Sequence, residues 1–351
     1  MLPGAEFSHT LITGVCGENE IDMLDGKYED PNIIQIPTMG RKPSLRADLL
    51  TFMKLRKILK QLAPDVVHTH TSKAGVLGRL AAFSLRKKIV IVHSYHGHHL
   101  YGYFSKVIVK SMVITERFLA YLTPLLVADS NQVMLDLQEV GIGKKSKWQV
   151  IPPGIRKLEK LSKDEARLNM KIGSDVFLIS WVGRFTDIKN PKLALEVLLD
   201  LNEIDQGKYV LIMVGDGELM QECKDFNEQN NLGIVFPGWE SKVSQYLAAS
   251  DILLVTSKNE GFGMVIAEAG FQNVPAVATD VGGVREFIVD QINGVLVPND
   301  AISIAKTIDA LAKNRGNLEK LGNMARKTTL EKFMIAQFVE NHKASYRNFS
   351  V

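Results

Sequence analysis

Short apolar runs alternate with amphipathic stretches along almost the whole chain. In the first half, the apolar runs have the length and β-branched content of buried strands, and the stretches between them repeat apolar residues at helical spacing. The expected strands are residues 7–13, 33–37, 66–70, 89–95, 125–130 and 148–152, and the expected helices include residues 45–62, 74–85 and 105–122. This alternation predicts a parallel sheet with helices on both faces.

A second series of the same kind follows a polar, charged stretch at residues 156–170. Its expected strands are residues 176–182, 209–214, 234–236, 252–256, 276–279 and 294–297. The sequence therefore predicts an α/β protein with two Rossmann-like, doubly wound parallel-sheet domains facing a cleft, with ligands at the carboxyl ends of the strands. We expect an N-terminal domain at residues 1–155, a C-terminal domain at 156–330 and a C-terminal helix at 331–351 that packs back on the first domain.

The opening of the chain departs from this pattern. A doubly wound domain normally begins with a buried strand, a glycine-rich turn and a helix, whereas residues 1–6 lead directly into what looks like a second strand. The regularity of the later elements favours a truncated start over a variant domain that never had these elements. On this interpretation the first domain lacks its first strand and glycine loop.

The bulk properties are those of a folded protein of two domains. The chain has 351 residues, of which 46% are hydrophobic and 23% charged, and a net charge of +3, which is too mild to argue for nucleic acid. The two cysteines, Cys16 and Cys223, have no metal-ligand spacing and form no disulfide framework. Since no apolar run reaches the roughly 18–20 residues that span a bilayer, we expect a cytoplasmic protein.

The most informative motif is Glu260-Gly-Phe-Gly-Met-Val-Ile-Ala-Glu268. It follows an expected strand and leads into an expected helix, so Glu260 should lie in the loop and Glu268 about one turn into the helix. Glycines let a backbone approach a ligand, and a helix start offers free N–H groups. Two acids in this arrangement can each hold a sugar hydroxyl, which predicts a nucleotide-sugar site made of residues Glu260, Gly261, Phe262, Gly263, Met264, Val265 and Glu268.

A second candidate loop follows the first strand of the second domain. Gly183 permits a tight exit from that strand, and Arg184 and Lys189 place two cations before Pro191, a residue suited to the first turn of a helix. Two cations beside a helix start suit a diphosphate leaving group. The chain contains no Asp-x-Asp pair to hold a divalent metal, so we expect no metal and no other cofactor.

Three weaker candidates also lie at strand ends. Gly215 begins a turn that borders the base or ribose, or is only structural. Gly238 and Trp239 belong to another such loop, where Trp239 either borders the base or caps the core. His96, followed by Gly97, is the best candidate among the histidines of the first domain, where it can donate to a sugar hydroxyl or to the leaving phosphate. These histidines have no accompanying cysteines or carboxylates at the spacing of zinc ligands.

The stretch at residues 98–126 is rich in aromatic and aliphatic residues and carries Lys106, Lys110 and Arg117. A basic amphipathic helix of this kind lies on a membrane surface or packs against a core. The first interpretation would make the acceptor a lipid-linked sugar.

Taken together, these motifs resemble the retaining glycosyltransferases of family 4, which have the GT-B fold, over nearly the whole chain. The residues that carry the resemblance are Gly183-Arg184 with Lys189, Gly215-Asp216-Gly217, Glu260 to Glu268, Val67-His-Thr-His-Thr-Ser-Lys-Ala-Gly75, His96-Gly97 and Val150-Ile-Pro-Pro-Gly154. The resemblance implies that Arg184 and Lys189 hold the donor diphosphate and Glu268 the ribose hydroxyls. It also implies that Glu260 faces the transferred sugar and that His96 contacts the sugar or its phosphate.

The expected function is transfer of a sugar, with retention, from a nucleoside-diphosphate sugar such as a UDP-sugar to an acceptor hydroxyl. The resemblance places the acceptor in surface polysaccharide or lipid-linked glycan synthesis, with peripheral contact at the inner face of the cytoplasmic membrane. Two alternatives remain: a nucleotide-sugar epimerase on the same fold, and a non-catalytic remnant that lacks the acceptor-side glycine loop. Incubation with the donor alone separates the first of these from a transferase.

Overall fold

The computed structural model describes residues 6–17, 24, 30, 32–40, 42–86, 88–98, 100 and 105–348. The chain divides into two compact units. The first comprises Met1–Asp129, Val133–Ile151 and Val339–Val351, and the second comprises Ser130–Gln132 and Pro152–Phe338. Among the described residues, no helix is both long enough and apolar enough to cross a membrane.

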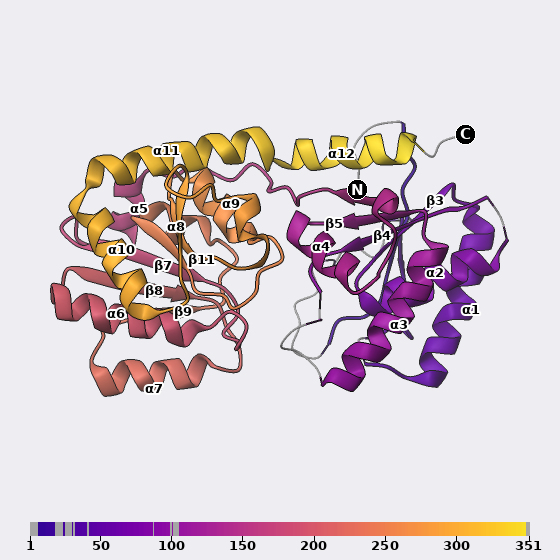
Figure 1. The fold of residues 1–351 in the computed structure, drawn as a ribbon, viewed down its shortest axis with the longest axis horizontal. Coiled ribbons are helices and arrows are strands. Elements are labelled where there is room, and N and C mark those ends of the chain that lie inside the picture. The colour runs from indigo at the N-terminus through magenta and orange to yellow at the C-terminus, as the bar shows by residue number, and fades with distance from the viewer. Residues whose placement is uncertain are drawn as a thin grey trace. The chain divides into compact units, whose positions relative to one another are not determined.

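The second unit is built on a six-stranded parallel sheet (Figure 1). Its strands are β7 (Phe177–Val182), β8 (Tyr209–Val214), β9 (Val235–Gly238), β10 (Ile252–Val255), β11 (Ala276–Thr279) and β12 (Gly294–Val297). They pair in the order β12-β11-β10-β7-β8-β9, so the strand order reverses between β7 and β10. This is the doubly wound arrangement that the alternating pattern predicted.

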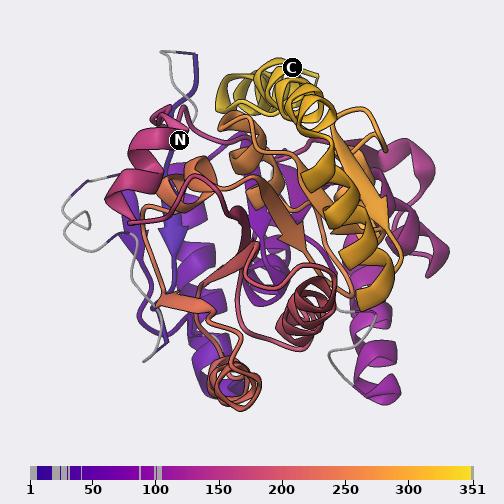
Figure 2. The same ribbon diagram turned by 90° about the vertical axis from the view of Figure 1, so that its left-hand side faces the viewer.

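Side chains of the second sheet alternate between two apolar layers. Phe177, Ile179 and Trp181 of β7 point into one layer, whereas Leu178 belongs to the other. Helices cover both faces (Figure 2). The first layer contains residues of α6 (Pro191–Ile204), α7 (Met220–Asn230), α10 (Ala301–Lys313) and α11 (Arg315–Lys332), and the second contains residues of α5 (Lys163–Asn169), α8 (Ser244–Ala249), α9 (Met264–Phe271) and α11.

The first unit contains a four-stranded parallel sheet in the order β3-β4-β5-β6. The strands are β3 (Val66–His70), β4 (Val90–Tyr95), β5 (Leu125–Ala128) and β6 (Trp148–Val150). Its helices are α1 (Leu45–Leu62), α2 (Ser72–Ser84), α3 (Lys106–Leu122), most of α4 (Asn131–Glu139) and the part of α12 (Ile335–Arg347) from Val339 onward. Single 3₁₀ turns occur at Lys145–Lys147 in this unit and at Gly282–Glu286 in the second.

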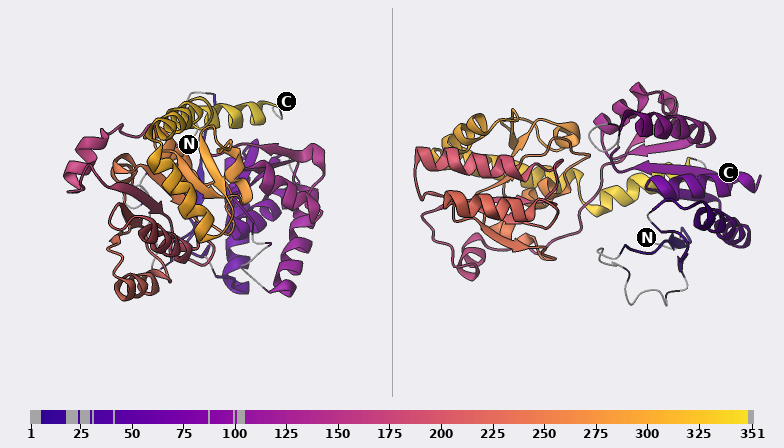
Figure 3. Two further views of the ribbon diagram at one scale, coloured as in Figure 1. Left: turned by 60° about the vertical axis from the view of Figure 1, so that its left-hand side comes forward. Right: turned by 90° about the horizontal axis from the view of Figure 1, so that it is seen from below.

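Two further strands of the first unit form a sheet of their own. Strands β1 (Leu11–Thr13) and β2 (Ile33–Gln35) pair in parallel, and among the described strands neither pairs with β3 (Figure 3). Ile12 of β1 and Val67 of β3 nevertheless pack against one apolar cluster, centred on Leu55, Leu59 and Ile91. The two sheets therefore share this cluster, while a second cluster that includes Tyr95, Leu126 and Trp148 packs against β4, β5 and β6.

Most element boundaries agree with the sequence-based expectation to within two residues. Two elements differ by more than that. The C-terminal helix was expected over residues 331–351, whereas α12 covers Ile335–Arg347. The first strand was expected over residues 7–13 but covers only Leu11–Thr13. The reason is that a strand extends only as far as it finds a partner, and Leu11–Thr13 pairs with the three residues Ile33–Gln35.

Candidate functional site

The candidate donor residues of the second unit lie at the point where its strand order reverses. Gly183 and Arg184 follow β7, and Glu260 lies in the loop between β10 and α9, while β7 and β10 are neighbours in the sheet. In open α/β sheets the loops that leave two such strands diverge to opposite faces and leave a crevice for ligands. The fold therefore brings the two motifs with the strongest sequence signal to one place.

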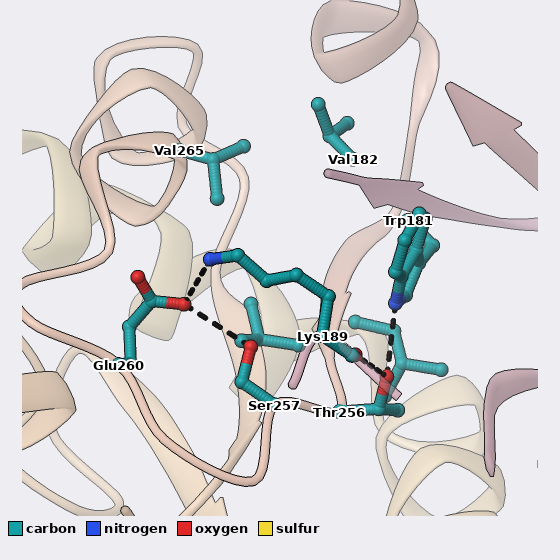
Figure 4. A pocket seen from close by; sticks show the side chains of 9 residues that line it. Trp181, Val182, Lys189, Thr256, Ser257, Glu260 and Val265 are labelled. Atoms are coloured by element: carbon teal, nitrogen blue, oxygen red, sulfur yellow. Dashed lines mark hydrogen bonds and ion pairs between the residues drawn. The ribbon is translucent and has the colours of Figure 1, made fainter. Parts of the chain in front are cut away.

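The loop that follows β7 is fixed by a buried threonine, Thr256, that comes directly after the adjacent strand β10. Thr256 Oγ1 donates to the main-chain oxygens of Lys189 and Asn190, at 3.1 and 2.9 Å, and accepts a hydrogen bond from Trp181 Nε1 at 2.9 Å (Figure 4). Helix α6 then begins at Pro191, whose ring suits the first helical position. These contacts fix the main-chain position from which the Lys189 side chain extends.

The two candidate cations have different surroundings. Lys189 Nζ forms an ion pair with Glu260, whose carboxylate also accepts from Ser257 Oγ at 3.1 Å (Figure 4). These three side chains line a small pocket together with Trp181, Val182, Leu254, Val255, Thr256 and Val265, with room for about one water molecule. Arg184 is exposed and has no ion pair among the described residues. Arg184 is thus an available positive charge, whereas Lys189 is neutralised by Glu260.

Glu268 lies on α9 and is half-buried. Burial raises the pKa of its carboxyl. No described residue gives Glu268 a hydrogen bond or an ion pair. A carboxylate that is partly desolvated without a partner costs free energy, so this side chain is poised for a hydrogen-bond donor from outside the protein.

Two pairs of glycines let these loops approach one another closely. A Cβ added to Gly215 would lie 1.9 Å from the carbonyl oxygen of Gly183, and one added to Gly283 would lie 2.0 Å from that of Gly261. A side chain at either position would push apart the loops that carry the candidate donor residues. The nitrogen of Gly215 also donates to the oxygen of Gly238 at 2.8 Å, which joins a third loop to this group.

The remaining candidates of the second unit differ in how far their side chains are buried. Phe262 is buried and packs against Phe333, so only its main chain is available to a ligand. Gly261, Gly263, Met264 and Val265 belong to the same loop and the start of α9. Trp239 is 57% exposed, which excludes the interpretation that it caps the core.

His96 belongs to the first unit, immediately after β4. Its Nδ1 lies 3.1 Å from the nearer carboxylate oxygen of Asp129, and its Nε2 lies 2.9 Å from Nδ1 of His70. The hydrogen bond that His96 Nδ1–H donates to the Asp129 carboxylate raises the pKa of His96. His96 was a sequence-based candidate, His70 appeared only as part of the motif at residues 67–75, and Asp129, one residue before the end of an expected strand, was not singled out.

The described residues include no group of three or more His, Cys, Asp or Glu side chains close enough to hold a metal ion.

Two family models match the chain in succession. The model described as Glycosyltransferase Family 4 matches residues 13–157, and the model described as Glycosyl transferases group 1 matches residues 162–328. The chain belongs to glycosyltransferase family 4. Its fold is the GT-B fold, with one Rossmann-like domain in each unit.

Several known proteins are similar to this family 4 glycosyltransferase in sequence or in structure. The UDP-Gal:alpha-D-GlcNAc-diphosphoundecaprenol alpha-1,3-galactosyltransferase of Escherichia coli is 29% identical over 362 aligned positions, which cover 99% of this chain and 90% of that protein. The putative glycosyltransferase EpsD of Bacillus subtilis is 27% identical over 92% of this chain and 85% of its own length. Anabaena Alr3699/HepE in complex with UDP superimposes with a TM-score of 0.79 at 18% identity, covering 97% of this chain and all of that one.

Proposed function

We propose that this glycosyltransferase moves a sugar from a UDP-sugar to an acceptor hydroxyl, with retention of configuration, in the synthesis of a surface polysaccharide or lipid-linked glycan. The observation that carries the donor assignment is the half-buried carboxylate of Glu268, which has no partner among the described residues. Glu268 lies in the same motif as Glu260, and Glu260 forms an ion pair with Lys189. The UDP complex of the similar Anabaena structure and the UDP-Gal specificity in the name of the Escherichia coli relative support UDP as the nucleotide.

In the proposed donor complex, Glu268 accepts hydrogen bonds from the ribose hydroxyls, while Arg184 and Lys189 bind the diphosphate. Glu260 faces the transferred sugar, and Gly183, Gly215, Gly238 and Trp239 border the nucleotide. Lys189 then exchanges one anionic partner for another, because its ammonium already pairs with Glu260. The carboxylate that Lys189 releases becomes free to accept from a sugar hydroxyl.

In the proposed reaction, the bond between C1 of the sugar and the leaving phosphate oxygen breaks, and a bond forms between C1 and the acceptor oxygen on the same face. The acceptor proton passes to the leaving diphosphate. Negative charge grows on that diphosphate as the bond breaks, so Arg184 and Lys189 stabilise the transition state more than the ground state.

Glu268→Gln is expected to weaken UDP binding while raising the stability of the free protein. The loss of affinity should be about 1.5–3 kcal/mol, the range for a hydrogen bond to a charged group. Because burial raises the pKa of this carboxyl, its ionised form destabilises the fold, and glutamine removes that cost above the folded-state pKa. The gain in melting temperature should therefore be present at pH 7.5 and fade as the pH falls toward 4.

Calorimetry with UDP and thermal unfolding at several pH values measure the two effects. Glu319→Gln, on the exposed surface of α11, is the matched control and should change neither quantity. Unchanged UDP affinity in Glu268→Gln would refute the ribose assignment.

We propose that the reaction needs no metal ion, since Arg184, the start of α6 and, once it releases Glu260, Lys189 can neutralise the diphosphate. The transfer rate should be the same with and without a chelator. Loss of activity in chelator, restored by magnesium or manganese, would contradict this scheme.

We further propose that α3 contacts an anionic membrane surface peripherally, at the cytoplasmic face. Val107, Ile114, Phe118 and Tyr121 recur at helical spacing and are all more than half exposed, and Lys106, Lys110 and Arg117 accompany them. Exposed apolar residues flanked by cations suit the boundary between anionic headgroups and acyl chains. A lipid-linked acceptor, such as the one in the name of the Escherichia coli relative, would be reached from that boundary.

The double variant Phe118→Ser/Tyr121→Ser is expected to bind vesicles with 30% phosphatidylglycerol at least about tenfold more weakly, because two aromatic side chains lose their burial in the interface. Sedimentation with vesicles measures the bound fraction. Leu168→Ser removes a similarly exposed apolar side chain on α5 and should leave binding unchanged. Equal loss in both variants would indicate nonspecific adsorption instead of docking through α3.

A further inference from the structure

Histidines of the first unit gather around the carboxyl ends of β3 and β4. His68 lies in the middle of β3 and His70 ends it, His93 belongs to β4, His96 follows β4, and His342 lies on α12. The ring centroid of His68 lies 4.3 Å from that of His70 and 5.4 Å from that of His342. The cluster is not a metal site by its geometry, since the described residues offer no set of three ligands around one point.

One histidine in the cluster differs from the others in its proton affinity. Burial, followed by the neighbouring histidines, lowers the pKa of His70 and His342 to about 4, and burial also holds the pKa of His68 and His93 well below the ordinary value. Only His96 has a raised pKa, because it is hydrogen-bonded to Asp129. Among the histidines of the cluster, His96 is therefore the first to take up a proton as the pH falls.

Three of these residues form a continuous hydrogen-bonded series. The carboxylate of Asp129, 12% exposed, lies 3.1 and 3.2 Å from Nδ1 of His96. Nε2 of His96 lies 2.9 Å from Nδ1 of His70, and the two ring planes are 11° from parallel. Nε2 of His70 has no hydrogen-bond partner among the described residues, and His70, although packed against His68 and His96, is still partly exposed.

Only one proton fits between the two imidazoles, and this fixes the tautomer of His70. The Asp129 carboxylate keeps a proton on Nδ1 of His96 in either state. When His96 is neutral, its Nε2 accepts, so His70 must carry its proton on Nδ1 and its outer Nε2 is an acceptor. When His96 is an imidazolium, its Nε2–H donates to His70, so His70 must carry its own proton on Nε2.

We propose that Asp129, His96 and His70 form a relay in which protonation of His96 switches the outer nitrogen of His70 from acceptor to donor, so that His70 hydrogen-bonds a phosphate or hydroxyl oxygen of the substrate. Asp129 is a positioning residue in this relay. The atom that the unit presents to a ligand is then Nε2 of His70, whereas both nitrogens of His96 are used within the protein. The link to substrate rests on the proposed transferase function, but the switch itself does not.

Nitrogen-15 NMR of histidine-labelled full-length protein tests the switch directly, since protonated and unprotonated imidazole nitrogens differ in chemical shift. In the unaltered protein, His70 is expected to carry its proton on Nε2 below the pKa of His96 and on Nδ1 above it. Asp129→Asn should lower the pKa of His96 and shift the tautomer of His70 at neutral pH. Asp136→Asn is the matched control, because the Asp136 carboxylate is hydrogen-bonded to Nε2 of His98, at 2.8 Å, outside the relay. It should change neither the pKa of His96 nor the tautomer of His70.

Two results would overturn the relay: a His70 tautomer that does not follow the titration of His96 in the unaltered protein, or an unchanged His96 pKa in Asp129→Asn. The first measurement needs no variant, so a folding defect in Asp129→Asn leaves the test intact. Titration with inorganic phosphate and with UDP-glucose tests the ligand role, and the Nε2 signal of His70 should move most below the pKa of His96. A working switch with no response to either ligand would overturn the substrate contact alone, while a missing transferase activity would leave the NMR result standing.

Discussion

Lys189→Ala is expected to lower kcat by a factor of about 10²–10³, while KM changes much less. This is the usual effect of removing one preorganised group that stabilises a developing negative charge. Lys189 starts from a loop that Thr256 fixes through two main-chain oxygens, so its ammonium is placed before the diphosphate arrives. Arg184→Ala should act in the same direction with a smaller effect, because Arg184 is exposed to solvent. Steady-state kinetics with a UDP-sugar donor gives both parameters.

The Lys189 variant also removes the partner of Glu260, and this second effect must be separated from the first. A double-mutant cycle of Lys189→Ala, Glu260→Gln and the double variant Lys189→Ala/Glu260→Gln separates the two effects. Lys192→Ala is the matched control, since Lys192 lies on α6 nearby and pairs with Glu222 at the surface. If kcat is unchanged in Lys189→Ala while KM rises, the lysine stabilises the bound substrate and the transition state equally and does not contribute to the chemical step.

The largest effect on stability is expected for Asp251→Ala, which should destabilise the second unit by about 3–5 kcal/mol. The Asp251 side chain is 1% exposed and accepts from the main chain of Leu178 and from Arg167, both at 2.7 Å, and it also pairs with Lys163 and Arg315. Removing the carboxylate leaves three cations around a desolvated site. Urea unfolding followed by tryptophan fluorescence measures the loss.

The same carboxylate gives the unit an acid-dependent stability. Burial by itself would raise the pKa of Asp251, but Lys163, the Leu178 amide and Arg167 hold it below its ordinary value. The stabilisation is therefore fully present above the unfolded-state pKa, near 3.9, and is lost as the pH falls through the folded-state value. The difference between the original protein and Asp251→Ala should shrink over that range, and Glu222→Gln, which breaks a surface pair, should show no measurable change at any pH.

The sequence predicted the order and type of the elements because each strand buries an apolar run that is visible without the structure. Residues 45–62, 66–70 and 209–214 were assigned with the observed bounds. The loop with Glu260 and the helix with Glu268 were also placed correctly, since glycines and a change of hydrophobic period mark that boundary.

The partners of the candidate residues could not be predicted in this way. Lys189 and Glu260 are 71 positions apart, and His96 and Asp129 are 33 apart, so neither pair leaves a local pattern. Asp251 leaves no local pattern either, because two of its cationic partners lie on α5, Lys163 and Arg167, and the third, Arg315, begins α11. The burial that raises the pKa of Glu268 is likewise a property of the packed unit.

The division of the first unit into two sheets has a consequence for handling the protein in concentrated solution. One continuous sheet has two edges, whereas, among the strands that the structure describes, the β1–β2 pair and the β3–β6 sheet together have four, including one side of β1 and one side of β3. Main-chain N–H and C=O groups along such an edge accept a strand from any neighbouring chain. Losses during concentration should therefore grow with protein concentration, begin in the first unit, and be reduced by a lysine or proline placed on the free side of β1.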